Sequence, residues 1–262
     1  MTVKGTMETD GFVMDYFSFG SGSTPFVLIP GVSAEPVTSM AEVVAQQYKL
    51  FHEDYVTWLF DRKRDFEDGY SIEAMADDTA KAMKRLSISN ACVMGSSQGG
   101  MIALYLAAKY PELVSKLVLC CTAASTDDID GQTLQEWVRI AESGDSESLY
   151  RAYYHSIYSE SFVMEYAEAI EAAVRTATPE GLHRLMELTK ACLNFDARPL
   201  LADIRCDCLV VGSRIDKVLG YRAAARLAET LDCRTVIYNQ YGHAAIDEAP
   251  DLKEKMLAFL KG

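Results

Sequence analysis

The chain has 262 residues, of which 49% are hydrophobic and 24% charged, a composition that excludes a disordered chain, a fibre and a disulfide-dense miniprotein. Its 38 acidic residues outnumber its 25 basic ones, and the net charge of −13 argues against a nucleic-acid partner, whose phosphates require a cationic face. The one dense basic run, Arg62-Lys63-Arg64, is flanked by Asp61 and Asp65, and we expect it to lie in a solvated loop.

The amino-terminal residues lack the apolar core of a signal peptide, and no run of 18 apolar residues predicts a membrane-spanning helix. The seven cysteines are an odd number without a disulfide framework, and most fall beside apolar runs, which is typical of buried thiols in a reducing compartment. Cys206-Asp207-Cys208 lacks zinc-ligand spacing. We therefore expect a cytoplasmic protein with no membrane partner, no metal and no organic cofactor.

In chain order, the stretch from Val3 to Phe19 alternates loosely and precedes a Gly/Ser run, which predicts an antiparallel hairpin at a sheet edge. Short apolar runs that follow predict buried strands at 26–29, 55–60, 91–94, 117–121, 208–211 and 234–238. Apolar residues at helical spacing predict helices over about 72–86, 98–110 and 256–260. Continuous apolar strands that alternate with helices indicate an α/β fold with a mostly parallel central sheet flanked by helices.

The segment from about 126 to 196 breaks this alternation, because it shows four helical patterns and no strong strand. One of these patterns predicts a helix from Met164 to Val174, and another predicts a helix from Leu182 to Leu193 that begins after Thr178-Pro179. About 70 residues are too many for a simple connection. We expect a core of residues 1–125 and 197–262 and a helical cap of residues 126–196.

The strongest chemical signal is the sequence Gly95-Ser96-Ser97-Gln98-Gly99, which follows a predicted strand and opens a predicted helix. A Gly-x-Ser-x-Gly pattern in that setting predicts a tight turn that presents Ser97 as a nucleophile. The backbone N–H of Gln98, at the helix start, is placed to donate to a developing oxyanion. The loop after the strand 26–29 should supply a second donor, for which the N–H of Val32 is the candidate.

A serine nucleophile requires a base, and the chain has four histidines. His243 is the candidate because it lies in a small-residue loop after the last predicted strand, at the sheet edge where catalytic groups gather. Asp216 follows the strand 208–211 and is the candidate acid, with a helix N-cap as its structural alternative. Asp127 or Asp128, after an earlier strand, remains an alternative acid. His52, His155 and His183 have no such position, although a histidine of the cap can line a cavity.

The order Ser97, Asp216, His243 resembles that of α/β-hydrolase-fold serine hydrolases over essentially the whole chain. More narrowly, several strings resemble the capped group of 3-oxoadipate enol-lactonase-like hydrolases and carboxylesterases: Asp61, Tyr70-Ser71-Ile72, Met75-Ala76-Asp77-Asp78, Gly242-His243-Ala244 and Glu248-Ala249-Pro250-Asp251. One departure is Pro30-Gly31, where that group usually has His-Gly. Esterases, lactonases, carbon–carbon hydrolases and cofactor-free haloperoxidases share these strings. The resemblance therefore implies the fold but does not select one substrate class.

These observations predict two-step acyl transfer on an ester or lactone of a small, mostly apolar molecule. Seven aromatic residues of the cap are expected above the site, although most should pack helix on helix: Trp137, Tyr150, Tyr153, Tyr154, Tyr158, Phe162 and Tyr166. Arg151 and Arg198 are expected in surface ion pairs. A carbon–carbon bond hydrolase, a cofactor-free peroxidase and a non-catalytic ligand-binding protein remain alternatives, and the sequence leaves open whether the chain forms a homodimer.

Overall fold

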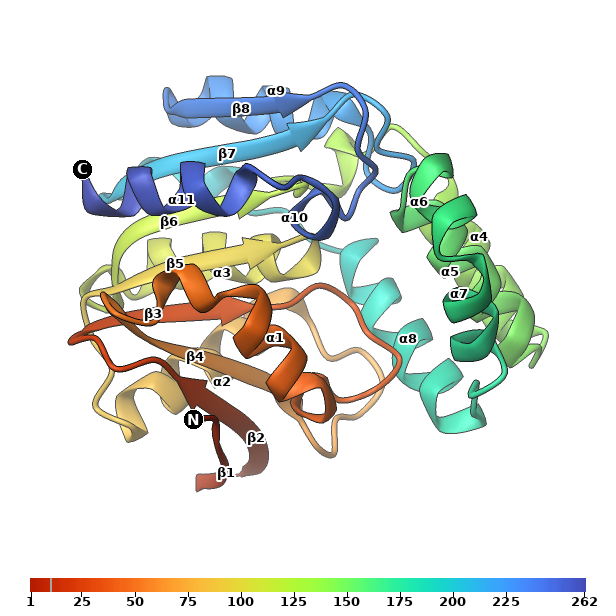
Figure 1. The fold of residues 1–262 in the computed structure, drawn as a ribbon, viewed down its shortest axis with the longest axis horizontal. Helices are drawn as coiled ribbons and strands as arrows, with labels where there is room; N and C mark the ends of the chain where they lie inside the picture. The colour runs from red at the N-terminus through yellow and green to blue at the C-terminus, as the bar shows by residue number, and fades with distance from the viewer. Residues whose placement is uncertain (10) are drawn as a thin grey trace.

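The structure, a computed structural model, describes residues 1–9 and 11–262. An eight-stranded sheet with the order β1-β2-β4-β3-β5-β6-β7-β8 runs through the molecule (Figure 1). β1 and β2 are antiparallel and form the predicted edge hairpin, β2 is antiparallel to β4, and all other neighbours are parallel. The strands are β1 (Val3–Thr9), β2 (Phe12–Phe19), β3 (Thr24–Ile29), β4 (Tyr55–Lys63), β5 (Ala91–Ser96), β6 (Val114–Cys120), β7 (Asp207–Ser213) and β8 (Arg234–Tyr238).

Helices cover both faces of this sheet, as the apolar strands predicted (Figure 1). α2 (Ile72–Arg85), α3 (Gln98–Lys109) and α9 (Tyr221–Leu231) bury their apolar residues against one face. α1 (Ala41–Gln47), α10 (Ala245–Glu248) and α11 (Leu252–Lys261) pack against the other. α2 begins where its sequence predicts, because the hydroxyl of Ser71 accepts a hydrogen bond of 3.1 Å from the N–H of Ala74.

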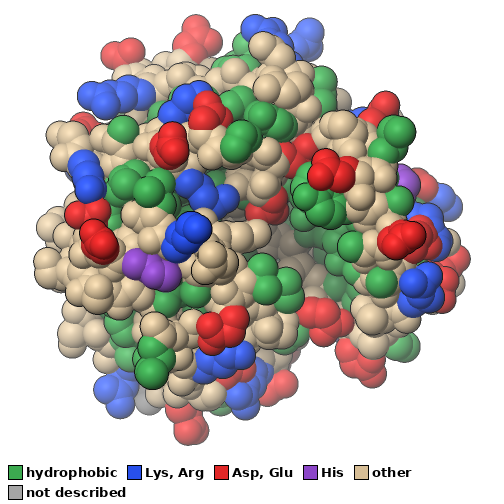
Figure 2. Space-filling model, viewed as in Figure 1, with side chains coloured by type: hydrophobic (Ala, Val, Ile, Leu, Met, Phe, Trp, Pro, Cys, Tyr) green, Lys and Arg blue, Asp and Glu red, His purple; other side chains and the backbone are tan. Residues whose placement is uncertain are grey.

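Five helices follow one another between β6 and β7 and lie together at one side of the molecule (Figure 1); we call residues 126–196 the helical insertion. The space-filling view shows a hollow between these helices and the rest of the fold (Figure 2). The five helices are α4 (Thr133–Glu142), α5 (Ser146–Ile157), α6 (Glu160–Glu165), α7 (Ala167–Val174) and α8 (Pro179–Cys192).

The single helix predicted over Met164–Val174 is wrong. The chain forms α6 and α7 there, and the helix breaks at Tyr166, whose φ of −107° and ψ of 22° are not helical. The apolar spacing misled the prediction because Met164 is 80% exposed and so does not belong to the buried stripe. α8, in contrast, begins at the predicted Thr178-Pro179, where the Thr178 hydroxyl accepts from the N–H of Gly181.

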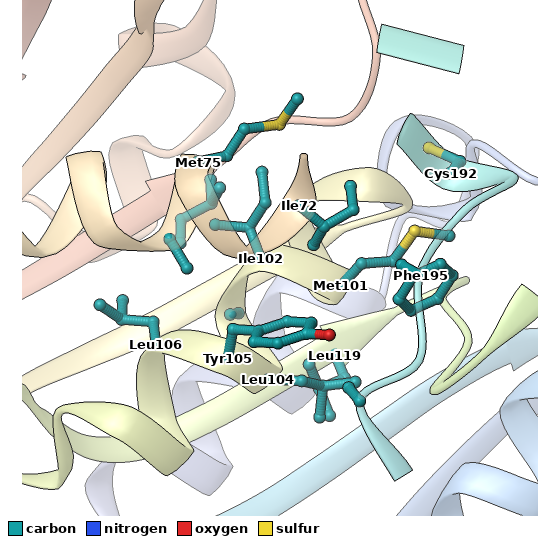
Figure 3. Close-up of a cluster of buried hydrophobic side chains, with 14 of the residues drawn as sticks. Ile72, Met75, Met101, Ile102, Leu104, Tyr105, Leu106, Leu119, Cys192 and Phe195 are labelled. Carbon is teal, nitrogen blue, oxygen red and sulfur yellow. The ribbon is translucent and has the colours of Figure 1, made fainter. Parts of the chain in front are cut away.

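The main core lies between α2, α3 and the sheet (Figure 3). Met101, Ile102 and Leu104 of α3 are buried against Leu119 of β6, and Ile72 of α2 packs beside them. α3 begins at Gln98, directly after the candidate nucleophile Ser97. The packing of α3 therefore fixes the helix that follows this residue.

The expectation of a solvated loop for Arg62-Lys63-Arg64 is wrong for Arg62 and Lys63, which belong to β4. β4 continues through Lys63 because β2 pairs with it, with Met14 opposite Lys63. Arg62 is therefore held in the sheet and is only 5% exposed, whereas Arg64 is exposed and pairs with Asp15. Within the described residues, no helix has both the length and the apolar character needed to cross a bilayer.

Candidate active site

Ser97 lies at the turn between β5 and α3. Its φ of 54° and ψ of −123° are a backbone conformation that residues other than glycine rarely adopt. Two hydrogen bonds from neighbouring structure hold this turn: the N–H of Ser97 donates to Cys120 O at 2.9 Å, and the Thr122 hydroxyl donates to Ser97 O at 2.7 Å. Strain of this kind persists only where surrounding structure imposes it, and it is the geometry of a nucleophile elbow.

The glycines around Ser97 are required by close backbone contacts. A Cβ on Gly95 would lie 2.3 Å from Gly99 O, and a Cβ on Gly99 would lie 1.9 Å from Ile29 O. Both distances are far below any real Cβ contact, so no other residue fits without moving the backbone. The two glycines therefore allow the tight turn that the Gly-x-Ser-x-Gly pattern predicted.

Asp216 and His243 come together from two loops beyond the ends of β7 and β8. His243 Nδ1 lies 2.8 Å from Asp216 Oδ2, and both side chains are almost fully buried. The other carboxylate oxygen, Oδ1, accepts from the N–H groups of Val218 and Leu219 at 2.8 and 3.0 Å. Asp216 therefore orders its own turn and holds the imidazole at the same time, and it does not cap α9, which begins at Tyr221.

Burial raises the pKa of Asp216, but the charge and hydrogen bond of His243 and the two backbone donors outweigh this and keep the pKa below its ordinary value. The carboxylate is thus ionised at neutral pH. An ionised, oriented carboxylate on Nδ1 leaves the Nε2 of His243 to exchange protons with a substrate or nucleophile.

Ser97 and His243 both line one cavity of about 720 Å³. Ser97 is half-buried, and its hydroxyl has no hydrogen-bond partner among the described residues. Catalytic hydrogen bonds often tighten only in the complex with substrate. The structure thus places the three predicted residues at one end of the sheet, with the pair Asp216–His243 joined and Ser97 on the same cavity wall.

The loop after β3 lies against Ser97. A Cβ on Gly31 would be 3.2 Å from the Cβ of Ser97, and Val32 lines the cavity. The backbone N–H groups of Val32 and Gln98 have no hydrogen-bond acceptor among the described residues. Two free donors beside a nucleophile are what an oxyanion hole requires.

A buried network behind this loop was not predicted from the sequence. Arg62 donates to the side-chain oxygen of Gln98 through Nε and Nη2, at 3.3 and 3.1 Å, and to Pro30 O at 2.7 Å. The side-chain amide of Gln98 in turn donates to Leu188 O of α8 at 2.6 Å. Burial lowers the pKa of Arg62 to about 10, so the guanidinium remains charged at neutral pH.

The helical insertion also holds the loop after β3. The hydroxyl of Tyr153 donates to Val32 O at 3.0 Å, and Arg184 Nε donates to Ser33 O at 3.2 Å. Arg184 also binds Asp61 at 2.8 Å. The same insertion contacts the histidine loop, because the N–H of Ala244 donates to Ile157 O at 2.7 Å.

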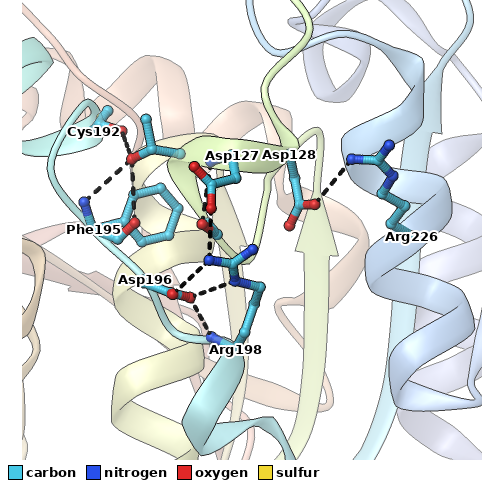
Figure 4. Close-up of polar contacts among 9 residues, drawn as sticks. Asp127, Asp128, Cys192, Phe195, Asp196, Arg198 and Arg226 are labelled. Atoms are coloured by element: carbon cyan, nitrogen blue, oxygen red, sulfur yellow. Dashed lines mark hydrogen bonds and ion pairs between the residues drawn. The ribbon is translucent and has the colours of Figure 1, made fainter.

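The alternative acids Asp127 and Asp128 do not contact His243. Asp127 pairs with Arg198 at 2.7 Å, and Asp128 pairs with Arg226 at 3.2 Å (Figure 4). Arg198 also binds Asp196, so its expected role in surface ion pairs is confirmed.

The other predicted polar residues lie elsewhere. Arg151 pairs with Glu171 at 2.9 Å, as expected for a surface ion pair. His155 and His183 are exposed, and His52 bonds Ala45 O near the opposite end of the sheet. Within the described residues, no three His, Cys, Asp or Glu side chains gather in a metal-binding arrangement.

The aromatic residues of the insertion line the cavity rather than only packing against each other, contrary to our expectation for most of them. All seven are on its wall: Trp137, Tyr150, Tyr153, Tyr154, Tyr158, Phe162 and Tyr166. Three of them stack in a row: the ring centroids of Tyr158 and Phe162 are 4.2 Å apart, and those of Phe162 and Tyr166 are 4.4 Å apart. The cavity is therefore mostly apolar, with aromatic faces opposite the sheet edge.

The chain belongs to the alpha/beta hydrolase fold family, whose model matches residues 24–250. A protein of Rhizobium rhizogenes named "Putative carbamate hydrolase RutD" is 30% identical over 201 residues, covering 75% of this chain and 77% of that protein. Among solved structures, MGS-M2, an alpha/beta hydrolase enzyme from a deep-sea metagenome library, superposes with a TM-score of 0.87 at 22% identity over 98% of both chains. The enol-lactonase of Burkholderia xenovorans LB400 superposes with a TM-score of 0.84 at 18% identity, over 98% of this chain and 100% of its own.

Proposed function

We propose that the chain is a serine hydrolase that cleaves an ester or lactone of a small, mostly apolar molecule. The observation that carries the proposal is the 2.8 Å contact between His243 and an ionised Asp216, on a cavity that also contains Ser97 in a strained turn. A pre-ordered imidazole that shares a cavity wall with a serine hydroxyl has the composition of a nucleophile and its base. The mostly apolar cavity wall supports an apolar acyl or aryl group.

In the proposed mechanism, His243 Nε2 removes the proton of Ser97 while Ser97 Oγ attacks the carbonyl carbon. The N–H groups of Val32 and Gln98 stabilise the negative oxygen of the tetrahedral intermediate. His243 then gives its proton to the leaving oxygen, and an acyl-enzyme remains on Ser97. Water, deprotonated by His243, attacks the acyl-enzyme and restores the free serine.

A carbamate ester is a second candidate substrate, because a relative of 30% identity bears the name of a carbamate hydrolase. The same residues apply to it without change: attack of Ser97 on the carbamate carbonyl gives a carbamoyl-enzyme and releases an alcohol. The two substrates differ in the second step, since a carbamoyl group is less electrophilic than an acyl group and leaves the serine more slowly.

Labelling with a fluorophosphonate, followed by intact-mass measurement, tests whether Ser97 is activated. We expect one adduct on the wild-type protein and none on Ser97→Ala. Labelling of both proteins would place the nucleophile elsewhere, and labelling of neither would favour a ligand-binding protein of this fold.

Turnover of p-nitrophenyl acetate and of a p-nitrophenyl N-alkylcarbamate then separates the two substrate classes. We expect steady release of nitrophenol from the acetate. A carbamate hydrolase would instead sustain turnover of the carbamate, without a burst that stops after one equivalent. Cleavage of a vinylogous diketone but of neither ester would favour the carbon–carbon hydrolase.

A further inference from the structure

The cavity that contains Ser97 and His243 is acidic. Two carboxylates lie on its wall, Glu35 after β3 and Asp247 in α10, and no lysine or arginine is found among the described residues that line it. In Figure 2, acidic and apolar side chains border the hollow beside the helical insertion, whereas the basic side chains in view lie on the outer surface away from it. The field in the cavity therefore favours positive charge over negative charge.

The nearest cations lie behind the wall and already have partners. Arg62 donates to Gln98 and Pro30 O, and Arg184 binds Asp61 and Ser33 O. Lys253 donates to Ile246 O at 2.6 Å. None of these three side chains lines the cavity, so a carboxylate in a substrate would find no cation to pair with.

Asp247 lies on the cavity wall and is exposed to the solvent that fills the cavity. The hydroxyl of Tyr158 approaches one of its oxygens at 3.5 Å, which is a long contact. The charge of Lys253 attracts it from a distance, and the charge of Glu248 repels it. The side chain therefore presents its carboxylate to whatever enters the cavity.

Glu35 makes one side-chain hydrogen bond, from the Tyr150 hydroxyl at 3.2 Å. Burial and the charge of Glu35 raise the pKa of Tyr150 to about 12, so this phenol stays neutral at neutral pH. The remaining wall is aromatic, and the faces of aromatic rings attract cations and repel anions.

We propose that this cavity selects substrates that are neutral or positively charged and rejects those that carry a free carboxylate. The inference rests on the proposed function, because it takes the cavity of Ser97 as the substrate site. It admits simple esters, lactones, carbamate esters and ammonium-bearing esters. It excludes acids, including free carbamate anions and lactones with a carboxylate side chain.

Three p-nitrophenyl esters with acyl chains of equal length test this selectivity. Their chains end in a methyl group, a carboxylate or a trimethylammonium group. We expect kcat/KM for the carboxylate ester to be at least tenfold below that of the neutral ester, and kcat/KM for the ammonium ester to equal or exceed it. A carboxylate ester hydrolysed as efficiently as the neutral ester would overturn the proposal.

Asp247→Asn and Glu35→Gln test the origin of the selectivity separately. Each variant should narrow the gap between the neutral and the carboxylate esters by a few-fold. Glu254→Gln is the matched control, because it removes the same charge from an exposed site on α11, away from the cavity. An equal narrowing in Glu254→Gln would show that the overall charge, and not the cavity, sets the preference.

Binding of the corresponding N-methyl amides, followed by tryptophan fluorescence, separates this proposal from the proposed function. Trp137 lines the cavity, and amide binding requires no turnover. Tighter binding of the neutral amide without any ester hydrolysis would support the selectivity and refute the hydrolase. Hydrolysis without discrimination by charge would support the hydrolase and refute the selectivity. Absence of both binding and hydrolysis would refute the hydrolase and the selectivity.

Discussion

The guanidinium of Arg62 donates two hydrogen bonds to the side-chain oxygen of Gln98, from Nε at 3.3 Å and from Nη2 at 3.1 Å. Nη2 also donates to Pro30 O at 2.7 Å. Gln98 carries one of the two backbone N–H groups of the candidate oxyanion hole, and Pro30 lies two positions before Val32, which carries the other. One buried side chain thus fixes the distance between the loop after β3 and the first turn of α3. Arg62 is a positioning residue in this arrangement, because it does not line the cavity.

Replacing Arg62 by methionine should lower kcat by about 10- to 100-fold with little change in KM, because loss of one oxyanion donor costs about 10²- to 10³-fold and displacement of a donor that is still present costs less. The variant should also be less stable, because Gln98 Oε1 and Pro30 O lose their donor, at a cost of about 1–3 kcal/mol for each buried group. Kinetics and urea unfolding measure the two effects. Arg62→Lys should recover part of kcat. Arg64→Met, at the exposed residue that follows β4, should change neither kcat nor stability. A fall in stability without a fall in kcat would make Arg62 purely structural.

Ser97→Ala should reduce ester turnover by on the order of 10⁴-fold or more, because the covalent route is lost and only binding and oxyanion contacts remain. The same variant should keep its thermal stability or become slightly more stable. The substitution leaves the surrounding packing unchanged and removes only a hydroxyl that makes no hydrogen bond among the described residues. Progress curves at high enzyme concentration and a melting curve check both points. Full activity in this variant would contradict the assignment of the elbow.

Asp216→Asn should lower kcat on the order of 10⁴-fold, because the amide no longer holds the imidazole in its working tautomer. Its effect on stability should depend on pH. The pKa of Asp216 lies below the unfolded value of about 3.9, so the stabilisation is present above that pH and is lost as pH falls through the lowered pKa. Melting temperatures at pH 7 and at about pH 2.5, below the unfolded pKa, measure this. The wild type should melt at a higher temperature than Asp216→Asn at pH 7, and the difference between the two melting temperatures should shrink at the lower pH. A difference that does not shrink below the unfolded pKa would contradict the carboxylate–imidazole pair.

Gly99→Ala should destabilise the fold by about 3 kcal/mol and displace the loop after β3, because its Cβ would lie 1.9 Å from Ile29 O. Gly131→Ala provides the comparison: its nearest heavy atoms would be 3.6 Å away and its φ is ordinary, so its effect should stay within about 0.5 kcal/mol. Denaturant unfolding of both variants distinguishes a site-specific requirement from a general intolerance of alanine for glycine.

Much of the fold was predictable from local patterns. The buried strands read as continuous apolar runs, the glycines around Ser97 marked a turn, and Ser71 and Thr178-Pro179 marked helix starts, because each signal lies within a few residues of the structure it causes. Asp216 and His243 were predictable from their places after strands, since the ends of parallel strands meet at one edge of the sheet.

The unpredicted features depend on contacts between distant segments. Arg62 reads as part of a charged run, and only the sheet pairing of β4 and the nearby Gln98 and Pro30 reveal it as a buried donor. The aromatic residues of the insertion read as a helical core because spacing reports which residues share a helix face and not whether that face meets another helix or a cavity. The break at Tyr166 was missed for the same reason.

The contacts of the helical insertion tie substrate range to catalytic rate. Tyr153 and Arg184 hold Val32 O and Ser33 O, and Ile157 O holds the backbone beside His243, so the helices that shape the binding cavity also brace the reacting groups. A chimera that receives these helices from another hydrolase would exchange the insertion's part of the cavity wall. In the same step it would lose the hydrogen bonds that Tyr153, Arg184 and Ile157 O make to the two loops. A redesign of the cavity wall must therefore keep or replace those three contacts, whereas wall residues that make none of them can be changed without releasing the two loops.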